Sequence, residues 1–359
     1  DFLIICVPTP LLEDKIPDLS YIKNACSTIE TFLHPGQFVI LESTTYPGTT
    51  DEVVIPILEE SGLKMGIDVG VAYSPERVDP GNIKYPLDKV PTVVGGINAN
   101  CTQIAAALYG SVVDRVIPVR DARTAEAVKM VENIFRNVNI ALVNEMALIF
   151  ERMGIDIWEV IDAAATKPYG FMPFYPGPGI GGHCIPLDPY YMSYRAKKFG
   201  FIPRFIETSG EINEFMKMHV INLAEQGLRQ VGKRLYGTKI AIMGLAYKKN
   251  INDPRESPAI KIVEELVNLG AEVQVYDPYV PSLVTKAGVF VSLGSVEETL
   301  SGAECVIFLV DHDVFRKISV ETMNKLMASP VVVDGKNLFA GEEEIIYLGI
   351  GKGGRKKVT

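Results

Sequence analysis

Short apolar segments alternate with helical segments in two separate parts of the chain, and this alternation limits the possible fold more than any other feature. In the first part, apolar runs occupy residues 2–8, 37–42, 68–73 and 91–95. Helical patterns lie between and after them, at 19–32, 49–61 and 99–109. Continuous apolar runs are typical of strands buried on both faces of a parallel sheet. The first part therefore predicts an α/β domain.

The same alternation restarts at Lys239, with a helical pattern at 257–269 between apolar runs. Those runs are KIAIMGLAY, EVQVYDP, ECVIFLV and VVVDGKN. Helical periodicity dominates between the two parts, from 122 to 165 and from 203 to 231. The predicted fold class is α/β, with two doubly wound Rossmann-like domains joined by a helical middle layer. The predicted boundaries are 1–118, 119–235, 236–350 and a basic tail at 351–359.

The composition excludes several classes of partner. The chain has 359 residues, 47% of them hydrophobic and 22% charged, which is enough to bury more than one core. The net charge of −9 disfavours a nucleic acid or an anionic membrane surface as principal partner. No apolar run reaches membrane-spanning length and no leader precedes Asp1, so the sequence predicts no targeting or transmembrane segment.

The five cysteines are odd in number, scattered and without CxxC spacing. This pattern supports neither a disulfide framework nor a zinc site. No metal is therefore expected, and a reducing cytoplasm is the expected compartment.

The stretch GPGIGGHCIPLDPYY at 177–191 places a thiol, an imidazole and a carboxylate within a few residues. Its glycines and prolines exclude a regular helix or central strand before Cys184. A glycine-rich turn, His183 or a helix beginning near Pro186 would each favour the thiolate. In such a helix, Asp188 falls in the first turn. A buried structural cysteine is the alternative interpretation.

Three loops follow predicted strands in the first domain, at 7–10, 43–49 and 74–81. Ligands of doubly wound sheets bind at the carboxyl ends of the strands, where these loops would meet. Thr44 is the residue of the second loop expected to contact a ligand, with helix capping as its alternative role. Glu76 in the third loop is either a functional carboxylate or a solvated surface group.

Lys129 and Asn133 are four residues apart in a predicted helix and lie on one face. Together they could donate to one developing oxyanion. A surface lysine is the alternative. In the last domain, Lys248, Lys249, Asp253 and Arg255 follow a predicted strand, which suits a phosphate or diphosphate. A surface charge cluster is the alternative there.

Taken together, these motifs resemble the UDP-glucose/GDP-mannose dehydrogenase family over nearly the whole chain. The shared motifs are Ser-Thr-x-x-Pro-Gly-Thr, Ser-Pro-Glu-Arg, Lys-x-x-x-Asn, Gly-Gly-His-Cys-x-Pro-x-Asp-Pro and Gly-x-Ala-Tyr-Lys-x-x-x-x-Asp-x-Arg-Glu-Ser-Pro. The cysteine motif is similar to the branch that oxidises UDP-N-acetylhexosamines, and UDP-N-acetylglucosamine is the expected substrate. UDP-N-acetylmannosamine and UDP-glucose are alternatives.

The resemblance implies oxidation of the primary alcohol of the sugar to a carboxylate with two NAD. Cys184 would capture the aldehyde as a thiohemiacetal and pass through a thioester. Lys129 and Asn133 would stabilise the oxyanion, Asp188 would position or deprotonate a water, Glu76 would act as base and Thr44 would hold the water. NAD contacts are expected from Pro8, Thr9, Ser43, Thr44 and Glu76. UDP-sugar contacts are expected from Arg77, Lys129, Asn133, Gly181, His183, Lys248, Arg255 and Lys336. A homodimer or larger even-numbered assembly through 126–150 is also implied.

One departure from the family concerns the first domain. The family begins with a strand, a GxGxxG turn and an acidic residue for the adenosine ribose, and none of these precedes Asp1. We therefore expect the first domain to lack its amino-terminal half, to expose an apolar sheet edge and to bind NAD poorly.

Two other classes of function fit parts of the sequence. A cysteine hydrolase would need a distant histidine, at 34, 219 or 312, because His183 is adjacent to Cys184. A non-catalytic UDP-sugar-binding protein would follow if the amino-terminal NAD segment is absent.

Overall fold

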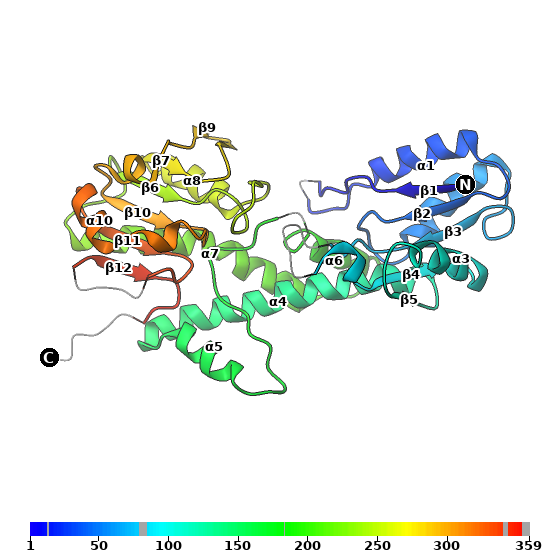
Figure 1. Cartoon of the computed structure of the whole chain (residues 1–359), viewed down its shortest axis with the longest axis horizontal. Coiled ribbons are helices and arrows are strands. Elements are labelled where there is room, and N and C mark those ends of the chain that lie inside the picture. Colours follow the sequence, from blue (N-terminus) through cyan, green and yellow to red (C-terminus); the bar gives the residue numbers. More distant parts are fainter. Residues whose placement is uncertain (13, 79–84, 183, 340–343, 354–359) are drawn as a thin grey trace. The chain divides into compact units, whose positions relative to one another are not determined.

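The structure, a computed structural model, is divided into two compact units (Figure 1). The first unit contains Asp1–Arg136 and Leu187–Glu207, and the second contains Asn137–Pro186 and Thr208–Thr359. Two long helices, α4 (Ala122–Met153) and α7 (Arg204–Gln230), each contribute residues to both units. The residues described are 1–12, 14–78, 85–182, 184–339 and 344–353.

The first unit is built on a sheet of five strands in the order β1-β2-β3-β4-β5. The strands are β1 (Phe2–Ile5), β2 (Phe38–Leu41), β3 (Gly70–Tyr73), β4 (Thr92–Gly96) and β5 (Val116–Pro118). The helical segments are α1 (Ser20–Phe32), a π-helical turn (Thr50–Val54), α2 (Ile55–Leu58), two 3₁₀ turns (Glu59–Ser61 and Leu87–Lys89), α3 (Ala99–Tyr109), the start of α4 and α6 (Asp188–Lys198). Each apolar run predicted in this part of the chain therefore contains a strand.

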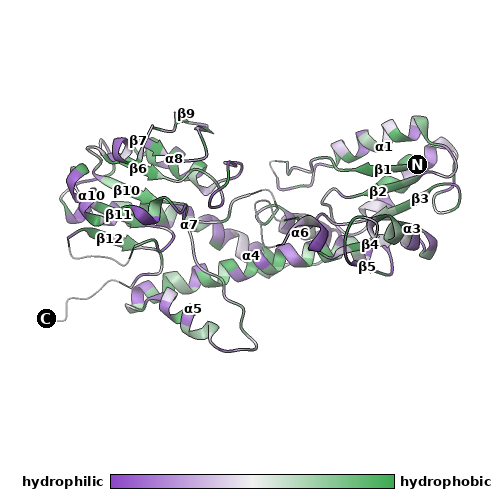
Figure 2. Ribbon diagram, viewed as in Figure 1, coloured by the Kyte–Doolittle hydropathy of each residue, from purple (hydrophilic) through white to green (hydrophobic). Residues whose placement is uncertain are grey.

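Both faces of the inner strands β2 and β3 are buried against helices, which explains their continuous apolar runs, whereas Phe2 and Ile4 of the edge strand β1 are exposed. On one face, Val39 and Val71 pack with Ile22 of α1 and Leu58 of α2. On the other face, buried strand residues pack with Cys101 and Ala105 of α3. Figure 2 shows the strands in hydrophobic colours. Successive strand residues point to opposite faces, so each face requires its own apolar set.

The direction of β4 differs from the predicted parallel arrangement. β4 is antiparallel to β3, with Ala72 opposite Gly96, whereas the β1–β2, β2–β3 and β4–β5 pairs are parallel. A parallel pair needs a crossover, usually an α-helix. Within the described part of the connection from β3 to β4, the helical structure is limited to the short turn Leu87–Lys89. Helix α3 supplies the crossover from β4 to β5.

The second unit contains a parallel sheet in the order β12-β11-β10-β6-β7. Its strands are β6 (Lys239–Met243), β7 (Glu272–Tyr276), β10 (Cys305–Phe308), β11 (Val331–Asp334) and β12 (Ile346–Gly349). The strand order reverses between β6 and β10, which makes the sheet doubly wound. The carboxyl edge at such a reversal is the usual position of a ligand.

Helices and a hairpin surround this second sheet. They are α5 (Ile157–Ala165), α8 (Pro258–Asn268), α9 (Val296–Leu300), a 3₁₀ turn (Phe315–Lys317), α10 (Val320–Leu326), and the hairpin of β8 (Ser282–Thr285) and β9 (Gly288–Val291). One core cluster joins residues of β6 and β10 to α7, α8 and α5. Another packs residues of the same strands against α9 and α10, so both faces are covered.

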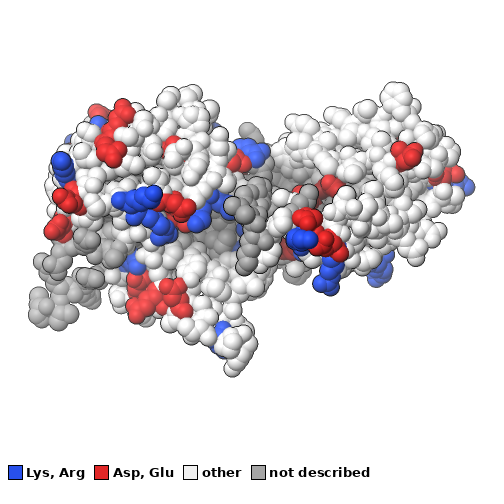
Figure 3. All heavy atoms as spheres, viewed as in Figure 1, with Lys and Arg blue, Asp and Glu red and all other residues white. Residues whose placement is uncertain are grey.

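None of the helices within the described ranges combines the length and apolar content needed to cross a membrane. The surface drawn in Figure 3 carries small groups of acidic and basic side chains next to one another.

Candidate active site

A buried polar group joins α4 to the first residue of α6 in the first unit. The side-chain amide of Asn133 donates to Asp188 Oδ2 at 2.5 Å, and Lys129 Nζ donates to the backbone carbonyl of Glu76. Lys129, Asn133 and Asp188 are all buried. The surface-lysine interpretation of Lys129 is therefore wrong, because its ammonium group is inside the unit.

The environment of Asp188 shifts its acidity toward neutrality. Burial raises the pKa of Asp188 from 3.8 to about 7, while the positive charge of Lys129 and the hydrogen bond from Asn133 lower it. Desolvation disfavours the charged form of a carboxyl group, and a nearby cation favours it. A carboxyl group with a pKa near 7 can take and return a proton at physiological pH.

Residues at the carboxyl ends of β1 and β2 come together in the first unit. The Ser43 hydroxyl is buried, donates to the carbonyl of Val7 and accepts from its N–H, both at 2.8 Å. Thr9 accepts a hydrogen bond at its carbonyl from the Tyr191 hydroxyl. Thr44 is half-buried beside Ser43, and Pro8 is exposed. Ser43 is therefore hydrogen-bonded to Val7, which directly precedes Pro8 and Thr9.

Glu76 and Arg77 lie in the loop after β3 and point to different partners. Glu76 is exposed, and its carboxylate accepts from the N–H of Val78. Arg77 donates to the carbonyl of Pro91 and pairs with Glu132 of α4 at 2.7 Å. Of the two, Glu76 is exposed to solvent, and Arg77 connects its loop to α4.

In the second unit, the glycines before Cys184 allow close packing of the loop. A β-carbon at Gly181 would lie 2.7 Å from Tyr247 Cβ and 2.9 Å from the carbonyl of Glu256. Gly182 has φ of +83°, and a β-carbon there would lie 3.0 Å from the Tyr247 ring. A side chain at either position would displace the loop. The loop is therefore packed against the segment that follows β6.

The thiol of Cys184 is exposed at the end of this loop and forms no disulfide. Arg255 interacts electrostatically with Cys184. The pKa of Arg255 is raised, mainly by its hydrogen bonds to Asp253, with Cys184 among the smaller causes. A cation beside a thiol favours the nucleophilic thiolate. His183 lies outside the described residues.

Basic side chains at the carboxyl edge of the second sheet come from two strand ends. Lys248 is half-buried in the segment after β6, and Lys336 is half-buried after β11. Asp334 organises the turn that carries Lys336, because its carboxylate accepts from the N–H groups of Lys336 and Leu338. Burial lowers the pKa of Lys336, while Asp311 and Asp334 raise it.

The cysteine loop contacts this second basic position. A β-carbon at Gly177 would lie 3.2 Å from Lys336 Nζ. Gly181 packs against Tyr247, the residue before Lys248. The second unit therefore brings together the cysteine loop and both strand-end segments that carry Lys248, Arg255 and Lys336.

Comparison with known proteins finds signatures of one family in three successive parts of the chain. The signature "UDP-glucose/GDP-mannose dehydrogenase family, NAD binding domain" matches residues 1–113. The signatures of the central domain and the UDP binding domain of the same family match residues 123–215 and 241–341. The chain belongs to the UDP-glucose/GDP-mannose dehydrogenase family. Dehydrogenases of this family act on nucleotide sugars, and NAD is the cofactor of the chain.

Several relatives match along almost the whole chain. A UDP-N-acetyl-D-mannosamine dehydrogenase from Pyrococcus horikoshii is 38% identical over 352 residues, covering 98% of this chain and 81% of the relative. A UDP-N-acetyl-D-glucosamine 6-dehydrogenase from Pseudomonas aeruginosa is 36% identical and covers 96% of this chain and 82% of the relative. A solved structure of UDP-D-ManNAc dehydrogenase from Pyrococcus horikoshii superimposes with a TM-score of 0.91 at 37% identity, covering 98% of this chain and 81% of that one.

The prediction that the first domain lacks its amino-terminal half is wrong. The NAD binding domain signature matches residues 1–113, and the solved relative superimposes over 98% of this chain. In the structure, β1 is bonded to β2 at all four positions from Phe2 to Ile5. The comparisons give no support to a non-catalytic alternative.

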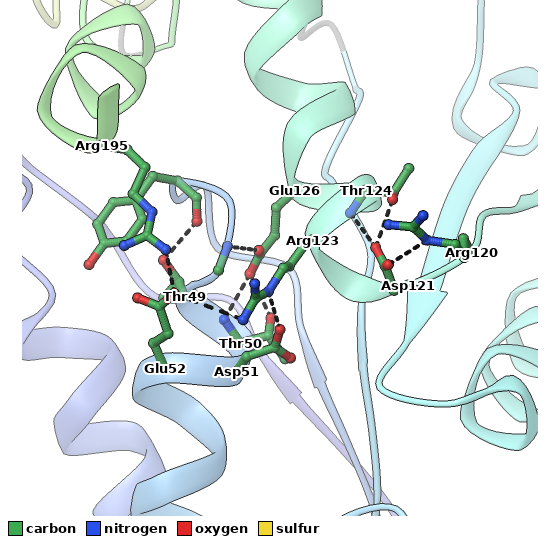
Figure 4. A network of polar contacts seen from close by, with 12 residues as sticks. Thr49, Thr50, Asp51, Glu52, Arg120, Asp121, Arg123, Thr124, Glu126 and Arg195 are labelled. Atoms are coloured by element: carbon green, nitrogen blue, oxygen red, sulfur yellow. Dashed lines mark hydrogen bonds and ion pairs between the residues drawn. The ribbon is translucent and has the colours of Figure 1, made fainter. Parts of the chain in front are cut away.

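Sequence reasoning missed Glu126, which anchors the loop that carries Thr44 (Figure 4). Its buried carboxylate accepts from the N–H of Gly48 at 2.5 Å and from the N–H and hydroxyl of Thr50 at 2.8 and 2.7 Å. Burial raises the pKa of Glu126 from 4.5 to about 7 despite these hydrogen bonds. Its position on α4, three residues before Lys129, was the available signal.

Two further ion pairs flank the same loop in Figure 4. Arg123 of α4 pairs with Asp51, and Arg195 of α6 pairs with Glu52. The hydroxyls of Thr45 and Thr49 form a short hydrogen bond with each other, at 2.5 Å. The π-helical turn begins at Thr50, so Thr44 does not cap it. The capping alternative for Thr44 is therefore wrong.

A buried histidine that sequence reasoning considered only as a catalytic base supports the segment after β6. His312 Nε2 lies 3.0 Å from Asp277 Oδ2, and both side chains are fully buried. His312 Nδ1 accepts from the N–H of Asn250 at 2.9 Å, and Asp277 accepts from the N–H of Leu245 at 2.6 Å. The His312–Asp277 pair therefore forms hydrogen bonds with the backbone before and after Lys248, at Leu245 and Asn250.

These contacts bear on the cysteine hydrolase alternative. His312 must accept at Nδ1 and donate at Nε2, so both ring nitrogens are already used. His219 pairs with Glu151 at 2.9 Å, and His34 belongs to the first unit, where it contacts Pro35. The family assignment replaces the hydrolase interpretation.

Proposed function

We propose that the chain oxidises C6 of a UDP-N-acetylhexosamine from alcohol to carboxylate with two NAD, through a covalent bond to Cys184. The observation that carries the proposal is the buried group of Lys129, Asn133 and Asp188. This group supplies two hydrogen-bond donors and a carboxyl group of near-neutral pKa. Of the three residues, Asp188 follows the exposed thiol of Cys184 by four positions in the sequence.

The strand ends of the first unit fit the cofactor. Thr9, Thr44 and Glu76 follow β1, β2 and β3, at the edge where doubly wound sheets bind dinucleotides. Thr44 is half-buried and Glu76 exposed, so both can reach a ligand. Bound NAD accepts the hydride in each of the two oxidations. We assign Pro8, Thr9, Ser43, Thr44 and Glu76 to this site, with Ser43 acting through Val7.

In the first oxidation, the alcohol loses its proton as C6 loses hydride. Asp188, directly or through a water, takes that proton, and the ammonium of Lys129 and the amide of Asn133 stabilise the alkoxide. The thiolate of Cys184 then adds to the aldehyde carbon. A C–S bond forms, and the carbonyl oxygen takes the negative charge beside the same donors.

In the second oxidation, loss of hydride from the thiohemiacetal carbon leaves a thioester. Water held by Thr44 attacks the thioester carbonyl, and Glu76 takes the proton of that water. The C–S bond breaks, the sugar carboxylate leaves, and Cys184 is again a thiolate. The full cycle returns the residues to their starting protonation state once three protons, one from the alcohol and two from the water, reach solvent.

The second unit is the proposed site of the UDP moiety. Lys248, Arg255 and Lys336 supply three positive charges to the diphosphate and sugar. Gly181 lets the cysteine loop approach the segment that carries two of them. His183 and Arg77 remain predicted sugar contacts.

The identity of the hexosamine is tested by direct comparison of two epimers. UDP-N-acetylglucosamine is predicted from the cysteine motif, and UDP-N-acetylmannosamine is the substrate in the name of one of the relatives. Each is incubated with NAD while absorbance of the reduced cofactor and the acid product are followed. The proposal requires two reduced cofactors per acid. A ratio of one, or turnover with UDP-glucose alone, would contradict it.

We also propose that the chain forms a homodimer through α4. Exposed apolar side chains recur along this helix at Val131, Phe135, Leu142, Ile149 and Met153. This spacing gives one apolar stripe, and exposed apolar stripes of this length mark interaction surfaces. A reducing cytoplasm is the proposed compartment, because Cys184 acts as a thiol and all five cysteines are free of disulfides.

A further inference from the structure

Both ends of the cysteine loop are bonded to asparagines of α4 within the second unit. The N–H of Gly177 donates to Asn144 Oδ1 at 3.0 Å. The side-chain amide of Asn137 donates to the carbonyl of Ile185, also at 3.0 Å. Ile185 directly follows Cys184. The glycine-rich segment from Gly177 to Ile185 is therefore held at each end by the same helix.

The two asparagines are connected to each other through α7. Asn144 donates to Asn213 Oδ1 at 3.0 Å, and Asn213 donates to the backbone carbonyl of Asn137 at 3.1 Å. The Ser209 hydroxyl donates to Asn137 Oδ1 at 2.7 Å. All four side chains are almost fully buried. We call the set of Asn137, Asn144, Ser209 and Asn213 the asparagine relay.

The direction of each hydrogen bond in the relay is determined by its ends. The N–H of Gly177 can only donate, so Asn144 must turn its oxygen toward it and its NH₂ toward Asn213. The carbonyls of Asn137 and Ile185 can only accept, which orients the other two amides. Buried polar networks with every member satisfied are rigid and specify one geometry.

Between its two ends, the loop also packs against Tyr247 through Gly181 and Gly182. Gly179 and Gly182 have positive φ, at +117° and +83°, which glycine adopts readily because it has no β-carbon. Cys184 is exposed. Gly179 adds a contact to the relay, because a β-carbon there would lie 3.1 Å from the carbonyl of Asn213.

We propose that the asparagine relay is a positioning device that holds the sulfur of Cys184 at the place where the sugar aldehyde must be captured. The proposal rests on the proposed function, in which Cys184 is the nucleophile. A displacement of a reacting atom by about 1 Å can reduce the rate about 100-fold. Asn137 and Asn144 act through the loop and do not touch the substrate.

The test uses Asn144→Ala and Asn137→Ala, each of which releases one end of the loop. Asn324→Ala, on an exposed site of α10, is the matched control. Alkylation of Cys184 by iodoacetamide is followed by mass spectrometry across a pH series without substrate. Cys6, which is also exposed but lies in the first unit, serves as the internal reference thiol.

Either relay variant should change the alkylation rate of Cys184 by about threefold or more and shift its pH midpoint, with Cys6 unchanged. The value of kcat should fall about 10- to 100-fold, and KM should stay within about threefold. A general loss of stability would not change Cys184 alone while sparing Cys6, nor lower kcat while leaving KM nearly unchanged. Folded variants with wild-type alkylation profiles and wild-type kcat would overturn the proposal.

If neither variant folds, the wild-type protein still decides the question. Gly177 lies between Pro176 and Pro178, so its amide is the exchangeable backbone hydrogen of that tripeptide. The relay requires slow hydrogen exchange at this amide, by about 100-fold or more relative to an open chain. Exchange at the open-chain rate would overturn the proposal.

Cys184→Ser separates this inference from the proposed function. Steady acid formation by that variant would contradict the role of the thiol, whatever the relay does. The alkylation and exchange measurements use wild-type Cys184 without substrate, so they would still report whether the relay holds the loop.

Discussion

Asn133 of α4 donates a 2.5 Å hydrogen bond to Asp188, the first residue of α6, and both side chains are buried. The same contact explains two properties of the proposed site. It fixes the carboxyl group in one orientation, and it partly offsets the burial that raises the pKa of Asp188 to about 7. Asn133 therefore orients the proton acceptor and, together with the charge of Lys129, limits how far burial raises its pKa.

The first prediction concerns Asp188. Asp188→Asn should lower kcat about 10²- to 10⁴-fold, the usual contribution of a general base. In the wild type, the rate should fall as pH drops below about 7, because the carboxyl group becomes protonated. Ser193→Ala, at another buried position of α6, should keep the wild-type profile. A wild-type rate independent of pH between about 5.5 and 8 would contradict the role of Asp188.

The second prediction concerns the thiol. Cys184→Ser should abolish steady formation of the sugar acid, because a serine hydroxyl is a much weaker nucleophile than a thiolate at neutral pH. Iodoacetamide should inactivate the wild type and Cys6→Ser at the same rate, since Cys6 is exposed but not part of the site. Protection by a UDP-sugar would place the ligand beside Cys184. Slower inactivation of Cys6→Ser would assign the sensitive thiol to Cys6 instead.

The third prediction concerns Glu126 and the free energy of unfolding. The folded-state pKa is raised to about 7 from 4.5, so between these values the folded protein keeps a proton that the unfolded chain releases. Stability must therefore fall as pH rises through this window, by about 3 kcal/mol in total. Glu126→Gln cannot ionise and should lack this loss.

Urea unfolding at several pH values measures this difference. The free energy of unfolding of the wild type should decrease relative to Glu126→Gln from pH about 4.5 to about 8. Glu132→Gln, at a partly exposed position of α4, is the matched control. If the difference in the free energy of unfolding between wild type and Glu126→Gln does not change with pH, the folded protein does not keep a proton on Glu126.

The fourth prediction concerns the apolar stripe of α4. Leu142 is 51% exposed, and Leu142→Glu would place a charge in the proposed dimer interface. The variant should elute as a monomer, with the mass measured by light scattering. Glu145→Gln, on the exposed surface of the same helix, should remain dimeric. A wild type of monomer mass would contradict the homodimer itself.

The fifth prediction concerns His312. His312→Phe keeps an aromatic ring between Tyr279 and Phe315 but leaves Asp277 and the N–H of Asn250 without their partner. The free energy of unfolding should fall by about 2–4 kcal/mol. KM for the UDP-sugar should rise more than kcat falls, because the segment with Lys248 loses its support. Asn324→Ala should change neither, and an unaltered KM in folded His312→Phe would contradict this role.

The strands were predictable because each one needs a continuous apolar run, as at Phe2–Ile5 and Lys239–Met243. The direction of β4 was not, because a short strand has the same composition whichever way it runs. That direction depends on whether a helix crosses the sheet before it. The edge strand β12 and the hairpin of β8 and β9 were also missed. For β12 the apolar run IIYL at 345–348 was the available signal, whereas the strands of the hairpin are only partly buried.

Residues of the proposed site could be selected from the sequence where chemically active side chains cluster along the chain, as at Cys184 and Asp188. This selection was not possible for Glu126, Asn137 and Asn144, because polar residues on a helix normally face water. Part of helix α4 has the opposite pattern. Its polar residues Glu126, Asn137 and Asn144 are buried, and its apolar residues Phe135 and Leu142 are exposed. The pairing of Asp277 with His312 depends on two strand ends that are distant in sequence.

On the proposed roles, the thiol and the diphosphate contacts belong to one unit of the chain, and the cofactor contacts belong to the other. Cys184, Lys248, Arg255 and Lys336 all belong to the second unit, and the strand ends assigned to NAD all belong to the first. On the proposed roles, spent cofactor can be exchanged for fresh while the half-oxidised sugar stays tethered at both its carbon and its diphosphate. We therefore expect no free aldehyde to escape during turnover, and an aldehyde-trapping hydrazine added to the reaction should capture none.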